Sequence, residues 1–199
     1  MITTDRRPAL AKAYEQAADV VSHVDRSQLG EPTPCAEYDV ATLVDHLVGA
    51  GRRAAAIGRG EPPSEEAFPH VELDDAPGQL RQAGKEARQA WSDDARLAAT
   101  VAMPWGETYT GATLVDMYLA ELATHAWDLA IATGLVDQLD PDLATTALDA
   151  AHAMLKPEYR NLMGPGSPFG SEVEAPSTAT GWERLAAFMG RAPRPAPAP

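Results

Sequence analysis

A glutamate and a histidine four positions apart, Glu121 and His125, form the pattern with the clearest chemical potential in this sequence. Residues at this spacing on a helix are neighbours on one face, so the carboxylate and the imidazole can converge on one point. Leu114 and Tyr118 share their stripe, which directs both side chains towards the apolar side of the helix. Burying a glutamate there is costly unless it is paired or binds a cation. The pattern fits a metal site, but a pattern this short and common taken alone favours an ion pair or hydrogen-bonded pair without a metal.

A third metal ligand would have to come from another helix, and two histidines compete for that role. His46 lies at the flank of the apolar arc of one predicted helix, and His152 lies in another. A lone histidine at such a position also fits a packed or hydrogen-bonded residue, and spacing alone does not separate the two candidates. Asp128, three residues after His125, either accepts a hydrogen bond from the imidazole and orients it or lies in solvent.

Other reactive residue types give weaker indications. Cys35 precedes a predicted helix start, where the helix dipole would lower the pKa of a nucleophilic thiol. A small thiol packed beneath that helix fits better, so we expect Cys35 to be buried and not to bind metal. The pair Arg52–Arg53 is typical of a solvated helix face, with contact to an anionic substrate as the alternative. The sequence contains no nucleophile elbow, phosphate-binding loop, HExxH motif or dinucleotide-binding glycine pattern.

The elements that must position these residues are expected to be helices. Two signals predict these helices: apolar residues that recur at steps of three and four, and residues typical of helix boundaries. They indicate six helices, over residues 8–26, 40–57, 77–91, 112–132, 141–155 and 181–189. Asp39 suits an N-cap, Pro141 suits a first helical turn, Gly58 and Gly60 close the second range, and Gly134 closes the fourth. Residues 97–110, with Pro104 and Gly106, predict a short hairpin, and residues 156–180 look irregular.

These elements predict an all-α fold, a four-helix bundle with an extra C-terminal helix and a short hairpin. The strands that an α/β sheet fold requires are lacking. We expect one domain over residues 1–190 and a disordered, proline-rich tail over residues 191–199.

Composition excludes several kinds of partner. The chain carries 16 basic and 29 acidic side chains, a formal net charge of −13, which argues against binding to nucleic acid or to an anionic membrane surface. Its single cysteine excludes an intramolecular disulfide framework. The N-terminal residues lack the apolar core of a secretory signal, and no apolar run is long enough to span a membrane. We therefore expect a cytoplasmic protein with a small-molecule substrate, and a homodimer is compatible with the sequence.

Two longer segments together resemble the DinB-like metal-binding superfamily. They read PTPCAEYDVATLVDHLVG and MPWGETYTGATLVDMYLAELATHAWDLAIATG, and they are most similar to the branch named for the N-terminal domain of mycothiol-dependent maleylpyruvate isomerase. The similarity spans roughly residues 8–190, and it is weaker at the later PFG and in the final WERLAAFMGR helix.

The resemblance implies a four-helix bundle that holds one divalent metal with three side chains from two helices. The ligand pattern of the family falls on His46, Glu121 and His125. The resemblance thus favours His46 over His152, and a metal site over a pair without metal. Zinc is expected first, with nickel, manganese or iron as alternatives. Catalytic residues and residues that bind any other cofactor are not assigned.

The implied activity is that of a thiol transferase or isomerase that uses mycothiol, with the metal activating a thiolate or water as a Lewis acid. Two alternatives remain: a metal-dependent hydrolase that uses the same site, and a bundle that binds a metal or ligand without catalysis. The isomerase of the resemblance carries an additional C-terminal domain that this sequence does not show. Contacts from that domain to thiol or substrate are expected to be absent.

Overall fold

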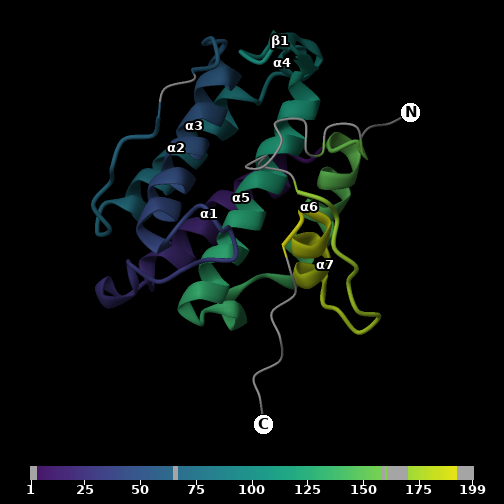
Figure 1. The fold of residues 1–199 in the computed structure, drawn as a ribbon. Coiled ribbons are helices and arrows are strands. Elements are labelled where there is room, and N and C mark those ends of the chain that lie inside the picture. The colour runs from purple at the N-terminus through teal and green to yellow at the C-terminus, as the bar shows by residue number, and fades with distance from the viewer. Residues whose placement is uncertain (1–3, 65–66, 158–159, 161–169, 192–199) are drawn as a thin grey trace.

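The computed structural model describes residues 4–64, 67–157, 160 and 170–191 (Figure 1). In this part of the chain the structure is mainly helical. Its α-helices are α1 (Arg7–Ser22), α2 (Val40–Arg59), α3 (Ala76–Ala90), α4 (Asp94–Ala98), α5 (Gly111–Thr133), α6 (Pro141–Met154) and α7 (Gly181–Phe188). Short 3₁₀ helices, η1 (Arg26–Gln28) and η2 (Val136–Gln138), lie in connections, and strands β1 (Thr100–Ala102) and β2 (Thr108–Thr110) form an antiparallel hairpin.

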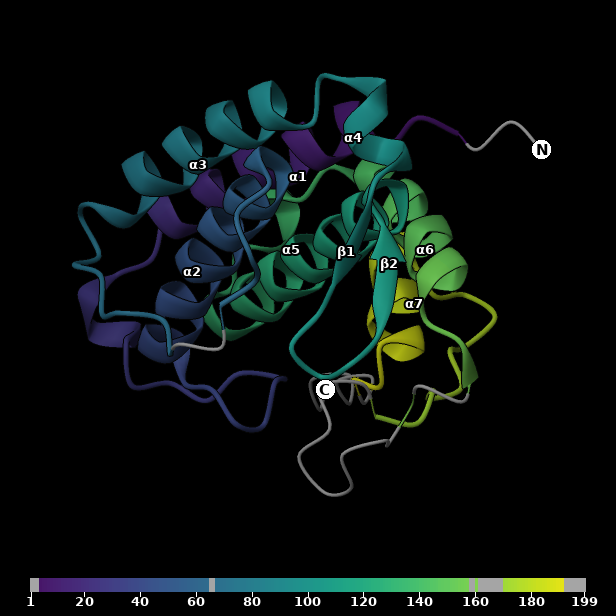
Figure 2. The same cartoon turned by 90° about the horizontal axis from the view of Figure 1, so that it is seen from above.

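Helix α5 lies at the centre of the bundle. It packs against α1 and α2 on one side and against α6 on the other, while α3 covers α1 and α2, and α7 packs on α6. Figure 2 shows this division, with α1, α2 and α3 to one side of α5 and α6 and α7 to the other. The elements share one hydrophobic core. The predicted all-α bundle with an extra C-terminal helix and a short hairpin is confirmed.

The boundaries of the two helices that carry the candidate site follow from local chemistry. The Asp39 side chain accepts a hydrogen bond from the Thr42 backbone N–H and caps α2, as predicted. The same helix ends at Gly60, whose φ of 91° favours glycine, whereas Gly58 lies inside the helix. At the start of α5, Thr110 accepts a hydrogen bond from the Thr113 N–H, and the helix ends at Gly134 with a φ of 77°. Pro141 occupies the first turn of α6, also as predicted.

Tyr14 fixes the spacing of three helices. Its hydroxyl, on α1, donates a hydrogen bond to the Gly51 carbonyl oxygen of α2 over 2.7 Å. A Cβ atom at Gly51 or at Gly84 of α3 would lie 2.8 Å from the Tyr14 side chain. These two glycines therefore allow the ring to lie between α2 and α3, and the helices approach closely around it.

Some segments depart from the sequence-based expectation. Helix α1 ends at Ser22, and η1 occupies part of the range predicted as helix, because the Asp25 side chain accepts a hydrogen bond from the Ser27 N–H and begins a new turn. Helices α4 and η2 were not predicted. The described residues between 156 and 180 contain no α-helix, and the tail over 192–199 lies outside the described residues. Arg191, assigned to that tail, is instead buried.

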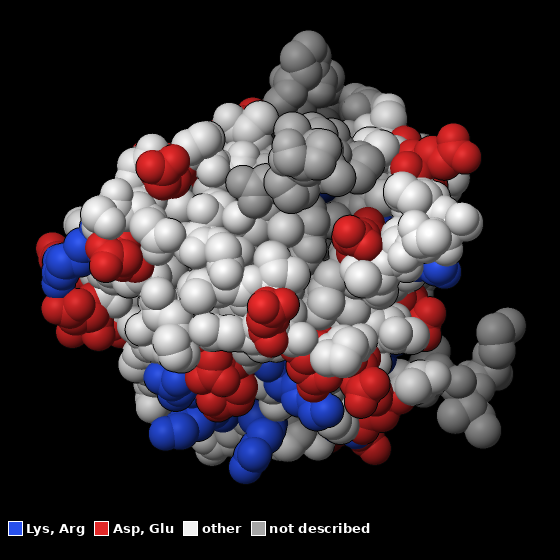
Figure 3. Space-filling model, turned by 90° about the horizontal axis from the view of Figure 1, so that it is seen from below, with Lys and Arg blue, Asp and Glu red and all other residues white. Residues whose placement is uncertain are grey.

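Charged side chains are unevenly distributed over the surface. On the face shown in Figure 3, uncharged side chains cover most of the centre, while most Lys and Arg side chains gather along one edge among Asp and Glu. The negative net charge is therefore not collected into one acidic patch on this face. Among the helices of the described residues, none has both the length and the apolar character needed to cross a membrane.

Candidate metal centre

Helices α2 and α5 bring His46, Glu121 and His125 together. The Nε2 atom of His46 lies 2.7 Å from Oε1 of Glu121, and Nε2 of His125 lies 3.6 Å from the same oxygen. One donor atom from each of the three residues lies within 4.8 Å of the others. The two imidazole rings are 4.7 Å apart between centroids. Two nitrogen donors and one carboxylate therefore converge on one region between the helices.

The cluster lies at the border between core and solvent. His125 is buried, at 6% exposure, whereas the side chains of His46 and Glu121 keep 17% and 23% of their surface exposed. His152, the rival candidate, lies exposed on α6, where its ring contacts Phe188 at 4.1 Å between centroids. The structure thus brings His46, and not His152, next to the Glu121–His125 pair.

Charge compensation shapes the protonation of the cluster. Burial raises the pKa of Glu121, but His125 and His46 outweigh this effect and hold the pKa well below its usual range. Burial lowers the pKa of His125, but Glu121 and Asp128 outweigh it and raise the pKa to about 9. Without a metal, His125 is therefore protonated at neutral pH. The surrounding carboxylates favour a positive charge at this position, and a divalent cation would satisfy the same demand.

Asp128 orients the His125 ring. Its Oδ2 atom lies 3.0 Å from Nδ1 of His125, and the Asp128 side chain is fully buried. This contact leaves Nε2 of His125 facing Glu121 and His46. A carboxylate behind a metal-binding histidine commonly fixes the tautomer and the orientation of the ring. Of the two roles considered for Asp128, the structure shows the contact with the imidazole.

The Asp128 carboxylate also pairs with the side chain of Arg191, which follows α7 and is 8% exposed. Nη2 of Arg191 lies 2.9 Å from Oδ2 of Asp128. Sequence reasoning missed this residue, because it stands at the start of a proline-rich segment that gave no sign of burial. Charge balance was the available signal, since a buried Asp requires a donor or a cation.

Aromatic rings cover part of the cluster. Tyr38 lies 4.9 Å from the His46 ring and Phe68 lies 5.3 Å from it, measured between ring centroids. A Cβ atom at Gly49 would lie 2.1 Å from the Phe68 ring, so the glycine allows this ring to rest on α2 beside His46. The Arg53 guanidinium lies 4.2 Å from the centre of the Phe68 ring, a cation–π contact. The Phe68 contact was not predicted, because it depends on how a connecting segment folds back onto α2.

The turn before α2 carries Cys35 to the same region. The Thr33 hydroxyl donates to the Tyr38 carbonyl oxygen over 2.7 Å, which closes this turn. The Cys35 sulfur, a nitrogen of His125 and an oxygen of Asp128 lie within 4.8 Å of one another. Cys35 is half-buried rather than buried, and burial raises the pKa of its thiol. The expectation that Cys35 is buried is therefore wrong, because the turn leaves this residue partly exposed.

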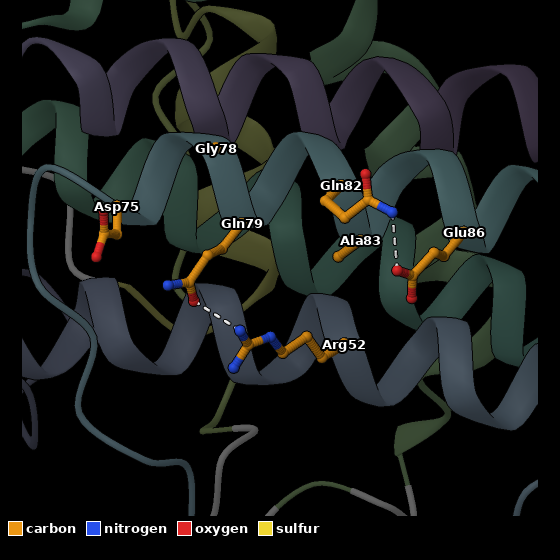
Figure 4. A pocket seen from close by; sticks show the side chains of 7 residues that line it. All are labelled: Arg52, Asp75, Gly78, Gln79, Gln82, Ala83 and Glu86. Carbon is orange, nitrogen blue, oxygen red and sulfur yellow. Dashed lines mark hydrogen bonds between the residues drawn. The ribbon is translucent and has the colours of Figure 1, made fainter.

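A separate pocket of about 360 Å³ lies between α2 and α3 (Figure 4). It is lined by Arg52, Asp75, Gly78, Gln79, Gln82, Ala83 and Glu86. Arg52 donates a hydrogen bond to Gln79 over 2.8 Å, and Gln82 donates one to Glu86 over 2.9 Å. None of the lining residues belongs to the histidine–glutamate cluster. The Arg52 side chain is exposed, as expected for a solvated helix face.

Comparison with known proteins identifies the family of this chain. The model of the mycothiol maleylpyruvate isomerase N-terminal domain family matches residues 10–130, which include all three residues of the cluster. The chain belongs to this family. Two proteins of Mycobacterium tuberculosis, from strains CDC 1551 and H37Rv, are each 34% identical to it over 185 residues, covering 92% of this chain and 96% of the relative. Both are described only as uncharacterized proteins, and no solved structure matches the chain.

Membership in the mycothiol maleylpyruvate isomerase N-terminal domain family confirms the resemblance seen in the sequence. The match ends at residue 130. Helices α6 and α7 and Arg191 therefore lie beyond the part of the chain that the family model covers.

Proposed function

We propose that this protein binds one divalent metal ion through Nε2 of His46, the Glu121 carboxylate and Nε2 of His125. The observation that carries the proposal is the convergence of these donors from two helices, with Nδ1 of His125 already engaged by Asp128. Two imidazoles and one carboxylate form a donor set that suits zinc, and also nickel or iron; manganese prefers a larger share of oxygen ligands.

Each residue has a distinct part in holding the ion. Glu121 supplies the negative charge that offsets the cation, and the two histidines supply neutral imidazole donors. Three ligands from the chain leave at least one coordination position for a substrate. When bound, the ion supplies Lewis-acid chemistry, which lowers the pKa of a coordinated thiol or water. Tyr38 and Phe68 cover part of the site with apolar surface.

The activity we propose is a metal-dependent transfer or isomerisation that uses mycothiol as the thiol. Support for the thiol comes from membership in the mycothiol maleylpyruvate isomerase N-terminal domain family. Support for chemistry at the cluster comes from the partial exposure of Glu121 and His46, since these two donors are not sealed inside the core.

Metal binding is tested on untagged protein. Elemental analysis of the purified protein is followed by removal of metal and titration with Zn²⁺, Ni²⁺ and Mn²⁺ by calorimetry. The expected result is one ion per chain for the wild type and a loss of at least about 100-fold in affinity for His46→Ala. His152→Ala is the matched control, because it removes an exposed histidine outside the cluster and should leave the affinity unchanged. Equal affinity for wild type and His46→Ala would overturn the proposed site.

The proposed reaction is tested with the metal-loaded protein, maleylpyruvate and mycothiol, with glutathione as the control thiol. Isomerisation, or formation of a thiol adduct, that depends on mycothiol and is lost in Glu121→Ala supports the proposal. Hydrolysis of ester or amide substrates without a thiol would favour a hydrolase. Metal binding without turnover in either assay would favour a protein that binds metal without catalysis.

A further inference from the structure

We infer that Arg191 is a positioning residue for the candidate metal centre, acting on His125 through Asp128. The inference rests on the proposed function, because it concerns how one proposed ligand is held. Arg191 touches neither Glu121 nor His46 in any contact described above. It lies after α7, beyond the residues that the family model matches.

The contacts of Arg191 are specific and buried. Its Nη2 atom lies 2.9 Å from Oδ2 of Asp128, and its Nε atom lies 3.3 Å from each Asp128 oxygen. The third nitrogen, Nη1, donates to the Met189 carbonyl oxygen over 3.0 Å. The guanidinium is thus tied to the end of α7 at one side and to α5 at the other. A planar guanidinium offers fixed donor directions, which a lysine cannot reproduce.

The same carboxylate oxygen serves both neighbours. Oδ2 of Asp128 lies 3.0 Å from Nδ1 of His125 and 2.9 Å from Nη2 of Arg191. Arg191 therefore fixes the rotation of the Asp128 carboxylate, and the carboxylate in turn fixes the plane of the imidazole. With Nδ1 acting as the donor to Asp128, the ring presents Nε2 towards Glu121 and His46. Loss of the guanidinium would leave a fully buried carboxylate free to turn away from His125.

The backbone explains how Arg191 reaches this position. Gly190, with a φ of 84°, donates from its N–H to the Ala187 carbonyl oxygen, and the Arg191 N–H donates to that of Ala186. This pair of bonds is the Schellman arrangement, in which a left-handed glycine ends a helix and turns the chain back. Backbone N–H groups thus satisfy the Ala186 and Ala187 carbonyl oxygens at the end of α7, and the Arg191 side chain adds a contact to the Met189 carbonyl oxygen. Neither part of this cap requires the contacts of the guanidinium with Asp128, so those contacts need a separate explanation.

The test compares Zn²⁺ affinity in wild type, Arg191→Gln and Arg191→Lys, with Arg6→Gln as the matched control. Arg6 forms a partly buried ion pair with Asp116, also on α5, at 2.9 Å. We expect Arg191→Gln to lose about 10- to 100-fold in affinity, as for other residues that orient a ligand. The Lys variant should lose less affinity, because it keeps the positive charge, although it lacks the fixed donor directions of the guanidinium. Arg6→Gln should stay within about twofold of wild type.

A second measurement separates positioning from general destabilisation. Nuclear magnetic resonance of the imidazole nitrogens of the Zn²⁺-loaded protein should show His125 with a proton on Nδ1 in wild type and Arg6→Gln. In Arg191→Gln the Nδ1–H signal should exchange faster or disappear. If Arg191→Gln does not fold, Arg191→Lys provides the comparison. Wild-type affinity and an unchanged Nδ1–H signal in the folded variant would overturn the inference, whereas failure of the wild type to bind any divalent ion would overturn the proposed function itself.

Discussion

The closest contact within the candidate metal centre, 2.7 Å between Nε2 of His46 and Oε1 of Glu121, joins two residues 75 positions apart in the chain. It crosses the interface between α2 and α5. A shift of either helix would separate the donor atoms, so the geometry of the candidate site depends on how these two helices pack. The close approach of α2 to α1 and α3 around Tyr14 thus contributes indirectly to the geometry of the site.

Glu121→Ala is expected to weaken metal binding more than it weakens the fold. The core comes from residues such as Leu114 and Leu122, which are fully buried without any ion. The unfolding free energy of the metal-free protein should change by about 1 kcal/mol, because His125 keeps its contact with Asp128. The melting temperature of the wild type should rise with added Zn²⁺, and that of the variant should not. A variant that is unfolded without metal would instead assign Glu121 a structural role.

Binding of Zn²⁺ at pH 7 is expected to release about one proton from His125. The pKa of this residue is about 9 in the metal-free folded protein, against a usual 6.5. Its ion pairs therefore stabilise the metal-free fold fully below about pH 6.5, and this contribution is lost as the pH rises through about 9. Because a metal requires the neutral ring, apparent affinity should increase with pH up to about 9. Calorimetry in buffers of different ionisation enthalpy measures the protons released, and no dependence on the buffer would contradict the prediction.

Asp128→Asn should destabilise the protein strongly, since it leaves the buried Arg191 guanidinium without its counter-charge. Breaking one side of a buried ion pair costs about 3 kcal/mol or more. The double variant Asp128→Asn/Arg191→Met removes both charges, so it should recover much of that loss. Urea denaturation of both single variants and the double variant gives the coupling energy. Strictly additive effects would mean that the two side chains stabilise the fold independently.

Gly49→Ala should destabilise the protein and disturb the surroundings of His46, because the added methyl group would collide with the Phe68 ring. Gly78→Ala is its matched control on α3, where a Cβ atom meets nothing within 4 Å. The control should gain about 0.5–1 kcal/mol from the higher helix propensity of alanine. Denaturation midpoints of the two variants should therefore move in opposite directions. A stabilising Gly49→Ala would show that Phe68 leaves its place at little cost.

Helices with a clear apolar stripe were predictable, because the spacing of their apolar residues and the residues at their ends are local features of the sequence. Asp39, Pro141 and Gly134 mark helix ends through contacts within a few residues, and the structure has them in those roles. Helix α4 has only five residues, and no periodicity can be recognised over such a length. Its position depends on packing against α5, which no local pattern encodes.

The candidate site was only partly predictable, and the reason differs between residues. Glu121 and His125 lie one turn apart, so their proximity follows from the helix itself. His46 could be chosen over His152 only through the resemblance, because spacing carries no information about which helices touch. Arg191 and Phe68 reach the site through contacts across the fold from segments without periodicity. Such contacts become visible only when the tertiary arrangement is known.

The separation of Arg191 from its partner also has a consequence for synthesis on the ribosome. Asp128 precedes Arg191 by 63 residues, and His46, Glu121 and His125 are all translated earlier still. A growing chain therefore carries all three proposed ligands well before the guanidinium exists to neutralise Asp128. In a nascent or truncated chain that stops short of α7, Asp128 has lost one of its two cationic partners, and His125 alone faces the carboxylate. Completion of the last helix is then the step that sets the final charge of the site.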